Sequence, residues 1–597
     1  MAALAAAGGA PVAPAGPSVV NINVGVLGHV DSGKTSLVRA LSTKLSTASL
    51  DKHPQSKERG ITLDLGFSAF MRPVPEHLRA GCPFTEVQFT LVDCPGHASL
   101  IRTIIGGAHI IDRMLLVVDV TKGIQTQTAE CLVIGEILTD DLTVVLNKVD
   151  LIPEAQREER VAKVKETINN VLATTRFKGS PILSVSAIVG GDGKAGVGEN
   201  AANQDLDAHG SQAAAATAAA TAADGAAVSG VQSLGLEDLV AHIERTTSLP
   251  DRGDVSNEPL YFAIDHCFPI RGQGKVMTGT VLSGSVEVGQ TVEIPQLKEE
   301  RKVKSMQMFR QPVQRAAKGD RVALCVSNLN DKLLERGVLT TPHSIPLTSA
   351  VVALVRKVKY FSLRCPSRSK VHITVGHSTT LGTVTLFGSP QLKEVAAKYA
   401  GKELPTLEFD DAAELEYDAE LRGGGKPKGG PFLHWALIEL DSPLICQDKS
   451  MIIGSRLDMD VDTKNCRIAF YGRVARQFAA PPTPAELQAL KVFKWKQREA
   501  IVDRVADKSP AADGTVRNVV ARNMFSKDAD LQRFLGKTLE TAAGERGRLE
   551  SAFGKTGKFN AYFPDGARLG RGDKLFLRFK HLLFASQDTN KRILQEL

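Results

Sequence analysis

Four short motifs of this 597-residue chain combine glycines, a lysine, hydroxyl groups and carboxylates at spacings that suit phosphate chemistry. They are GHVDSGKT (residues 28–35), DCPGH (93–97), NKVD (147–150) and the dipeptide SA (186–187). The first motif follows an apolar run, which predicts a strand before the loop. It precedes a segment of helical periodicity, which predicts a helix that carries Leu37, Val38, Leu41 and Leu45. Such a loop binds anions, because its amides point inward and the helix adds the positive end of its dipole.

The residues of the loop divide the work of holding a nucleotide. Gly28 and Gly33 permit the backbone path around the phosphates. Lys34 can reach the β- and γ-phosphates as a point charge, and the hydroxyl of Thr35 can coordinate Mg²⁺. Asp93, at the end of an apolar strand over residues 87–92, is suited to hold the same ion through water.

Two further positions predict a response to the nucleotide and the identity of its base. Gly96 can offer its amide to the γ-phosphate and can flip its peptide cheaply, so the following segment is expected to move when that phosphate is lost. Asp150 can accept two hydrogen bonds from N1 and N2 of guanine, whereas adenine would leave the carboxylate unpaired. The sequence therefore predicts GTP rather than ATP.

The remaining motif residues are expected to shape the base pocket. We expect Asn147 and Lys148 to hold the loops around the base, and the amide of Ala187 to contact the guanine oxygen. Any one of these motifs alone is compatible with an ordinary polar loop, but four in order are not.

The elements that position these motifs are expected to form an α/β P-loop GTPase domain, a mostly parallel sheet with helices on both faces. Three β-rich barrel-like domains are expected to follow it. Proline, glycine and alanine tracts and changes of periodicity predict the following boundaries: a disordered tail (1–20), a GTP-binding domain (21–250) with a disordered insertion at about 190–233, β-barrel domain 2 (258–346), β-barrel domain 3 (349–476) with a surface loop at 421–430, and a basic β-rich domain 4 (485–597).

Composition limits the class of protein. The hydrophobic content of 43% supports ordinary globular packing, and no run of about 18 apolar residues could span a membrane. The first 20 residues lack the basic residues of a signal or organellar peptide. The eight cysteines contain no Cys-x-x-Cys pair, so we expect reduced thiols in a cytoplasmic protein. We also expect the protein to be a monomer.

The positive charge of the chain is concentrated in its last domain. Residues 481–597 hold 22 Lys and Arg against 14 Asp and Glu, whereas the whole chain holds 73 against 66. Basic and aromatic residues alternate in KVFKWKQR (491–498) and KLFLRFKHLLF (574–584). Alternation puts Phe493 and Trp495 near the face opposite the neighbouring lysines. We expect such aromatic side chains to form the core of a barrel beneath a solvated basic face, and the alternative is that they stack on RNA bases. The excess charge favours an RNA or ribonucleoprotein partner.

The four motifs together resemble translational GTPases of the elongation factor Tu type. In that family RGIT (59–62) forms the first switch loop, so the resemblance implies a second hydroxyl ligand for Mg²⁺ from Thr62. It also implies that His97 orients the attacking water and that Val30 and Ile61 form the apolar gate that restrains it. RGQGKVMTGTVLSG (271–284) resembles the second-domain barrel that receives the aminoacyl end of tRNA.

The expected cofactors are GTP and Mg²⁺, and their ligands come from all four motifs and the first switch loop. Nucleotide binding is expected from Gly28, Asp31, Ser32, Gly33, Lys34, Thr35, Ser36, Thr62, Asp93, Gly96, Asn147, Lys148, Asp150, Ser186 and Ala187. Metal coordination is expected from Thr35, Thr62 and Asp93.

A narrower resemblance, to the eukaryotic selenocysteine-specific elongation factors, runs over almost the entire ordered chain. It is carried by KERGITLDLGF, KVKSMQMF (302–309), GSRLDMDVDTKNCRIAF (454–470) and SAFGKTGKF (551–559), and by Ser32, where elongation factor Tu has histidine. It implies delivery of selenocysteinyl-tRNA to a ribosome paused at a UGA codon. It also implies that the last domain contacts the selenocysteine insertion element of the mRNA or the protein bound to it.

This resemblance implies a site that separates selenocysteine from its precursor serine. A selenol is more acidic than a thiol and is anionic at neutral pH, so charge can distinguish it from a neutral hydroxyl. The matching positions are Asp265, His266 and Arg321: the arginine would pair with the selenolate, the histidine would donate a hydrogen bond, and the aspartate would hold the cationic groups or meet the aminoacyl amine. The alternative is a cluster of surface charges on the rim of the barrel.

Two other classes of GTPase share parts of this pattern. One is the GTPase subunit coupled to a sulfurylase, which needs a catalytic partner and no tRNA. The other is the γ-subunit type of initiation factor, which carries a zinc knuckle that this sequence lacks.

Overall fold

The computed structural model covers the chain and describes most of its sequence. The described residues are 19–45, 65–80, 82–95, 110–187, 234–253, 255, 257–270, 274–327, 336–376, 378–400, 403–423, 432–459, 466–507, 514–526, 530–554, 557–585 and 594–595. Most of the expected tail, the expected insertion and the loop after Gly423 lie outside these ranges. So do four expected site residues, Ile61, Thr62, Gly96 and His97.

A mixed sheet forms the centre of the first domain, in the order β2-β3-β4-β1-β5-β6-β7. Its strands are β1 (Val19–Gly28), β2 (Lys44–Leu45), β3 (Gly66–Pro73), β4 (Glu86–Asp93), β5 (Arg113–Asp119), β6 (Leu142–Asn147) and β7 (Ile182–Ser184). The five strands from β4 to β7 in this order are parallel, and β2 and β3 are antiparallel to their neighbours. β1 begins at Val19, two residues inside the expected tail, because Val19 and Val20 already pair with β4.

Helices cover both faces of this sheet. They are α1 (Lys34–Leu41), α3 (Glu76–Arg79), α5 (Thr126–Leu138), α6 (Glu154–Leu172) and α7 (Leu236–Thr246), with a short 3-10 turn η2 (Val149–Leu151). Apolar residues of α1 and α7 pack on one face, and those of α5 and α6 pack on the other. Leu45, which the helical periodicity assigned to α1, instead lies in β2, since the helix ends at Leu41.

Three barrels follow, each a ring of six strands. The first ring contains β8 (Tyr261–Ile270), β9 (Gly274–Ser283), β11 (Thr291–Ile294), β12 (Glu299–Met308), β15 (Arg321–Val326) and β16 (Gly337–Thr340). The second contains β17 (Leu347–Lys357), β18 (Ser369–Val375), β19 (Ser378–Gly388), β21 (His434–Ile445), β22 (Met451–Ser455) and β23 (Ile468–Phe478). The third contains β24 (Val492–Val505), β25 (Val516–Arg522), β26 (Thr538–Thr541), β27 (Arg546–Phe553), β28 (Lys558–Ala567) and β29 (Lys574–Leu582).

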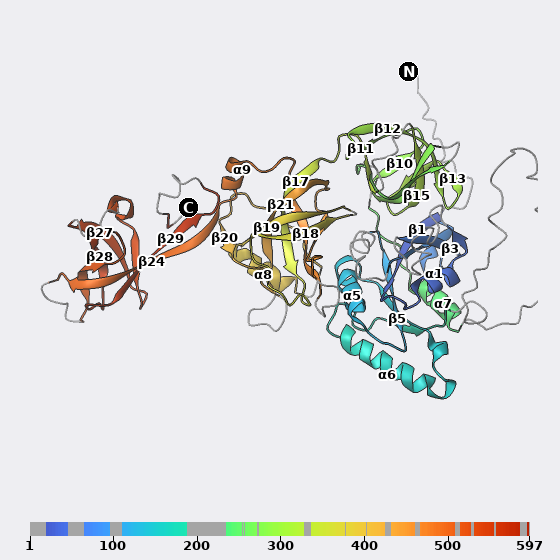
Figure 1. Cartoon of the computed structure of the whole chain (residues 1–597), viewed down its shortest axis with the longest axis horizontal. Coiled ribbons are helices and arrows are strands. Elements are labelled where there is room, and N and C mark those ends of the chain that lie inside the picture. Colours follow the sequence, from blue (N-terminus) through green and yellow to red (C-terminus); the bar gives the residue numbers. More distant parts are fainter. Residues whose placement is uncertain are drawn as a thin grey trace, which may run out of the picture.

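Smaller elements complete the barrels and connect them: β10 (Ser285–Glu287), β13 (Gln311–Val313), β14 (Arg315–Ala317), α8 (Pro390–Lys398), β20 (Leu415–Asp418), α9 (Pro484–Ala489) and η3 (Leu531–Phe534). This arrangement confirms the predicted fold class. Figure 1 shows the molecule as elongated, with the last barrel at the end far from the first domain.

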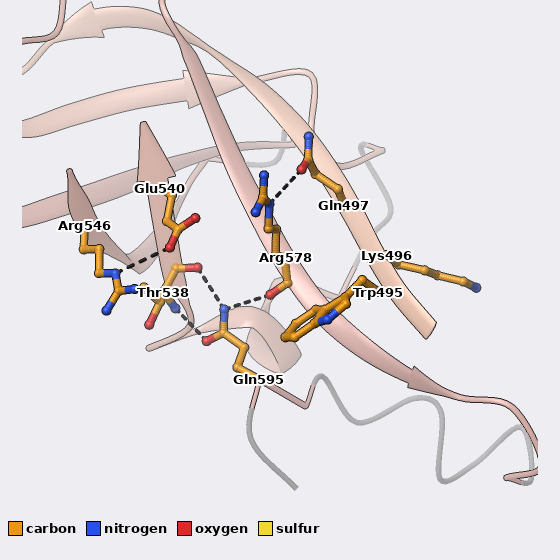
Figure 2. Close-up of a pocket in the computed structure, with 8 residues that line it drawn as sticks. All are labelled: Trp495, Lys496, Gln497, Thr538, Glu540, Arg546, Arg578 and Gln595. Carbon is orange, nitrogen blue, oxygen red and sulfur yellow. Dashed lines mark hydrogen bonds and ion pairs between the residues drawn. The ribbon is translucent and has the colours of Figure 1, made fainter. Parts of the chain in front are cut away.

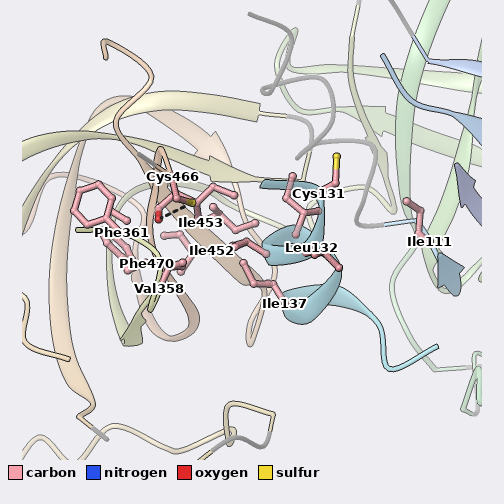
Figure 3. Close-up of a cluster of buried hydrophobic side chains, with 14 of the residues drawn as sticks. Ile111, Cys131, Leu132, Ile137, Val358, Phe361, Ile452, Ile453, Cys466 and Phe470 are labelled. Atoms are coloured by element: carbon pink, nitrogen blue, oxygen red, sulfur yellow. Dashed lines mark hydrogen bonds between the residues drawn. The ribbon is translucent and has the colours of Figure 1, made fainter. Parts of the chain in front are cut away.

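The second barrel packs directly against helix α5 of the first domain. Figure 3 shows Leu132 and Ile137 of α5 facing Ile452, Ile453 and Phe470 of the barrel, all of which are buried. Beside this apolar contact, the carboxylate of Glu130 accepts hydrogen bonds at 2.8 and 2.9 Å from the guanidinium group of Arg467. Both side chains are less than 10% exposed, so the ion pair fixes the two domains in one relative position.

Replacing Glu130 with glutamine is expected to weaken this docking by about 2 kcal/mol, because Arg467 would stay buried without a full counter-charge. The measurement is hydrogen exchange of α5 and β23 amides in the native protein. The control is Asp140→Asn, which removes a charge of the same sign from an ion pair whose aspartate is 75% exposed, and should change exchange little. Equal effects of both variants would contradict a structural role for the buried pair.

The first barrel also contacts the first domain through the first half of the central strand β1, ahead of the phosphate loop. The side-chain amides of Asn21 and Asn23 donate to the carbonyl oxygen of Gly319 at 2.7 and 3.0 Å. Arg252 donates to both carboxylate oxygens of Asp112 and fills the space beside Gly319, where a Cβ atom would overlap its guanidinium group. This contact holds the turn that leads into β15 and Arg321.

The last barrel is joined to the second by a narrow connection. β20 and β24 pair in parallel over only two residue pairs, and Lys580 forms an ion pair with Glu414. Between the two barrels β24 and β29 run as a paired ribbon. Residues 494–499 of that ribbon are exposed on both faces, which matters for the basic and aromatic residues that it carries.

Candidate functional site

The phosphate loop runs from the end of β1 into α1 as expected. Gly33 has φ +88° and precedes the helix, and a Cβ atom there would overlap the side chain of Asn147. Lys34 is 6% exposed, and its ammonium group donates to the carbonyl oxygen of His29 at 2.7 Å. Burial lowers the pKa of Lys34, and the charge of Asp93 opposes this shift. A buried cation beside inward-facing backbone is the arrangement that a phosphate group would complete.

The hydroxyl of Ser32 points into the same loop. Its oxygen is buried and has no hydrogen-bond partner among the described residues. Asp31 adopts a left-handed conformation with φ +59°, and Ser36 is exposed on α1. Val30 lies half-buried at the start of the loop, where its amide donates to Gln127 at 3.2 Å. The unsatisfied hydroxyl and the buried ammonium fit a polyanionic ligand.

Two of the expected metal ligands lie together. The hydroxyl of Thr35 donates to Oδ2 of Asp93 at 2.6 Å, which brings the first turn of α1 to the end of β4. Asp93 is fully buried, and the next residue, Cys94, is 1% exposed. Burial raises the pKa of the Cys94 thiol, so this side chain packs as a neutral group. A hydroxyl and a carboxylate are hard oxygen ligands of the kind that Mg²⁺ prefers.

The base-selecting residues form one connected set of loops. The side-chain amide of Asn147 donates to the carbonyl oxygen of Ser32 at 3.0 Å, and its oxygen accepts from the amide of Ala187 at 3.2 Å. The carboxylate of Asp150 accepts from the hydroxyl of Ser186 at 2.6 Å. Asn147 thus links the phosphate loop to the loops expected to surround the base, although it lies 115 positions from Ser32 in the sequence.

Lys148 has a partner that the sequence analysis missed. It adopts φ +67°, and its ammonium group lies 2.9 Å from Oδ2 of Asp119 at the end of β5. Burial alone would raise the pKa of Asp119, but hydrogen bonds from Thr121 and Lys148 lower it below the usual value. The available signal was the position of Asp119 at the carboxyl end of an apolar run, where ligand sites of parallel sheets lie.

A second site lies where the first barrel meets the first domain. Arg321 is 3% exposed and forms an ion pair with Asp265, which is also 3% exposed. The guanidinium carbon lies 2.9 Å from the ring centroid of Phe67 in β3, and the imidazole of His266 donates to the carbonyl oxygen of Leu65 at 3.3 Å. The three expected residues are therefore together and covered by the first domain, rather than solvated on a barrel rim.

A bulge in the strand pairing produces this cluster. β8 shifts register between Ile264 and His266, which lets Asp265 and His266 both leave the regular alternation. Arg321 is the first residue of β15 and pairs with Thr280, whose hydroxyl also accepts from the arginine at 3.4 Å. Phe67 was missed by the sequence analysis, because nothing in its local pattern distinguishes it from a core residue.

Some aromatic residues of the last barrel lie in its core, and one is exposed to solvent. Phe493 and Phe579 are buried, which supports a core role. Trp495 is 44% exposed, so the expectation of a core role is wrong for this residue. The reason is the ribbon of β24 and β29, which leaves the core of the last barrel at this point and exposes both faces.

Three further observations concern the cysteines, the clusters of metal-binding side chains and the lengths of the helices. All eight cysteines lie in described parts of the chain, and each carries a reduced thiol. Within the part of the chain that the structure describes, no group of three or more His, Cys, Asp and Glu residues is placed so that it could hold a metal ion by itself. Over the same residues, no helix has the length and apolar character needed to cross a membrane.

Comparisons with known families agree with this architecture domain by domain. Residues 20–248 match the elongation factor Tu GTP binding domain, and residues 274–339 match elongation factor Tu domain 2. Residues 352–472 match the third domain of eukaryotic selenocysteine-specific elongation factors, and residues 488–587 match the eEFSec C-terminal RIFT domain. The fold and the nucleotide motifs thus define an elongation factor of the elongation factor Tu type with a GTP-binding GTPase domain.

Full-length relatives narrow the class. The chain is 41% identical over 625 aligned residues to the selenocysteine-specific elongation factor of Mus musculus, covering 96% of this chain and 99% of the mouse protein. It is 32% identical over 456 residues to that of Methanocaldococcus jannaschii, covering 76% and 79%. The chain belongs to the eukaryotic selenocysteine-specific elongation factors, which are GTP-dependent translation factors, and this excludes the sulfurylase-coupled and initiation-factor alternatives.

A solved structure supports the fold. Elongation factor SelB of Methanococcus maripaludis, in complex with the GTP analogue GPPNHP, superposes with a TM-score of 0.63 at 23% identity, over 94% of this chain and 99% of that one.

Proposed function

We propose that this factor uses GTP and Mg²⁺ to capture selenocysteinyl-tRNA, delivers it to ribosomes at UGA codons, and hydrolyses GTP to release it. The observation that carries the proposal is the buried pair of Arg321 and Asp265 beneath Phe67. This pair supplies a cation for the cargo in the first barrel, at its contact with the nucleotide-binding domain. Lys34, Thr35 and Asp93 would hold the phosphates and the metal ion, which neutralises charge on the phosphates when bound.

Chain continuity supports a link between the nucleotide and the cargo site. Thr62, the expected second hydroxyl ligand of Mg²⁺, precedes Leu65 by three residues and Phe67 by five. Leu65 and Phe67 contact His266 and Arg321 directly. A force that orders Thr62 at the phosphates therefore acts on the residues that cover the cargo site, and loss of the γ-phosphate would release them.

The chemistry of the pair supports discrimination by charge. In its present arrangement the guanidinium group is neutralised by Asp265 and rests on an aromatic ring. A selenolate that enters the site would gain a charge-assisted hydrogen bond from Arg321, whereas the neutral hydroxyl of serine would gain only a weak one. A buried site increases this difference, because water screens it less.

Hydrolysis is assigned to His97, which would orient the attacking water, with Val30 and Ile61 as the apolar gate. Phosphoryl transfer to water needs a positioned nucleophile and charge stabilisation more than covalent help. The buried lysine and the Thr35 and Asp93 pair provide for the charge. The basic last domain would contact the selenocysteine insertion element or the protein bound to it.

Retention of aminoacylated tRNA on filters tests this function. The GTP-bound protein is expected to retain selenocysteinyl-tRNA strongly, and to retain the seryl form of the same tRNA and methionyl initiator tRNA at least about a hundredfold more weakly. With GDP in place of GTP, all three should be weak. Equal retention of the three tRNAs in the GTP state would defeat the proposal.

A further inference from the structure

A pocket of about 670 Å³ opens on the last barrel where the ribbon of β24 and β29 meets β26 and the chain end. Figure 2 shows its eight lining residues as sticks. They are Trp495, Lys496, Gln497, Thr538, Glu540, Arg546, Arg578 and Gln595. Its volume falls in the range of sites that bind small organic groups.

Trp495 gives the pocket a flat apolar surface that faces solvent. Its ring is 44% exposed and meets the ring of Phe493 edge-on, with centroids 5.5 Å apart. The ammonium group of Lys580 lies 5.7 Å from the same indole, from the strand paired with it. Buried neighbours therefore support the ring, although half of its surface remains open to a ligand. The other tryptophan of the chain, Trp435, is 5% exposed in the second barrel.

The rest of the lining is polar and carries an excess of positive charge. Three cations, Lys496, Arg546 and Arg578, outnumber the single carboxylate of Glu540. Glu540 is already partnered by Arg546 at 3.4 Å. A lining with this excess of positive charge attracts an anion more strongly than it attracts a protein surface that is neutral or poor in acidic residues.

Two amide side chains held by hydrogen bonds also line the pocket. The guanidinium group of Arg578 donates to Oε1 of Gln497 at 2.9 Å, and Figure 2 shows the amide nitrogen of Gln497 turned away from that contact. Gln595 is held by three hydrogen bonds with the backbone of Thr538 and Arg578, between 2.8 and 3.1 Å. Amides and guanidinium groups are the side chains that hydrogen-bond the edges of nucleobases.

We infer that this pocket binds an unpaired nucleotide of single-stranded RNA, with the base stacked on Trp495 and the adjacent phosphates on Arg546 and Arg578. The inference rests on the proposed contact of the last domain with recoding RNA and specifies its chemistry. An unpaired base is required, because a base within a duplex offers no free face to stack on an indole. A protein partner fits less well, since the lining offers no aliphatic side chain beside the ring.

Tryptophan fluorescence can test the inference directly, because the chain has only two tryptophans. The full-length protein with Trp435→Phe reports on Trp495 alone. A uridine dodecamer is expected to quench this emission on binding, whereas its duplex with an adenosine dodecamer should bind more weakly and quench little. Quenching by both to the same extent, or by neither, would overturn the assignment.

Variants separate stacking from general charge attraction. Trp495→Ala is expected to weaken binding of the uridine dodecamer by about tenfold to a hundredfold, while Trp495→Phe should retain most of the affinity. Arg546→Ala should weaken binding, and it should reduce the slope of log affinity against log salt concentration by about one, since one fewer phosphate is neutralised. Arg533→Ala is the matched control, since it removes the same charge from an exposed ion pair of the same barrel outside the pocket.

The outcomes distinguish this inference from the proposed function. If Trp495→Ala binds the dodecamer as well as the parent protein does, the stacking assignment is wrong, whatever the effect of the arginine variants. If it instead loses only the contact with a protein of the recoding assembly, the pocket is a protein site and the inference is also wrong. GTP-dependent retention of selenocysteinyl-tRNA by the same variant checks that the fold and the proposed function are intact.

Discussion

Replacing Asp150 with asparagine is expected to lower the affinity for GTP by about a thousandfold and to make XTP the preferred nucleotide. The carboxylate presents two acceptors, which match the two donors of guanine. An amide presents one acceptor and one donor, which match the N1 donor and the C2 oxygen of xanthine. The measurement is a calorimetric titration of each variant with GTP and XTP.

The loop that holds this residue should survive the substitution. Asp150 accepts a hydrogen bond from Ser186 at 2.6 Å, and the oxygen of asparagine can accept the same bond. Ser186→Ala is the control, because it removes this support without changing the groups that face the base. It should weaken GTP binding about tenfold and leave the preference for GTP over XTP unchanged. A loss of GTP binding without gain of XTP binding in Asp150→Asn would place the base elsewhere.

Replacing Arg321 with methionine is expected to reduce the preference for selenocysteinyl- over seryl-tRNA by two to three orders of magnitude, or about 3 to 4 kcal/mol. Arg321 is the buried cation at the proposed cargo site, and methionine keeps most of its length and its apolar contact with Phe67. Binding of seryl-tRNA should change little, because the neutral hydroxyl gains little from the charge. The measurement is the ratio of the two dissociation constants in the GTP state.

Two further variants serve as controls for this prediction. Arg321→Met leaves Asp265 buried without its ion-pair partner, so the double variant with Asp265→Asn removes that penalty and should fold normally. Lys318→Met removes a cation three residues away that is 29% exposed and lies 3.5 Å from Glu258. If Lys318→Met lowers the preference as much as Arg321→Met does, the specific role of Arg321 is refuted.

The sequence predicts well what depends on residues close together in the chain. The phosphate loop and the strand, loop and helix around it are local, and their glycines have the backbone angles that the motif requires. Barrel strands could be predicted from their alternation and turns. The end of α1 could not, because Leu45 continues the helical pattern while its backbone pairs with β3.

Contacts between domains could not be predicted from the sequence. Glu130 and Arg467 are 337 positions apart, and neither belongs to a motif. Phe67 contacts Arg321 across a domain boundary although its own strand pattern indicates an ordinary core residue. For Trp495 the prediction was wrong in the opposite sense. Alternation assigned its side chain to a barrel core, whereas the ribbon of β24 and β29 has no core on that side and the side chain is exposed.

In the proposed function, cargo selection depends on the charge of a single side chain, and cysteine on the same tRNA tests this dependence most directly. A thiol is mostly neutral at pH 7 and becomes anionic above a pKa of about 8.5. The affinity of the GTP-bound protein for cysteinyl-tRNA, measured from pH 6 to 9 beside the selenocysteinyl and seryl forms, is expected to rise about tenfold or more across that range. Selenocysteinyl-tRNA should stay tight and seryl-tRNA weak throughout. Cysteinyl-tRNA that binds equally weakly at every pH, or as tightly as selenocysteinyl-tRNA at pH 6, would contradict recognition by charge.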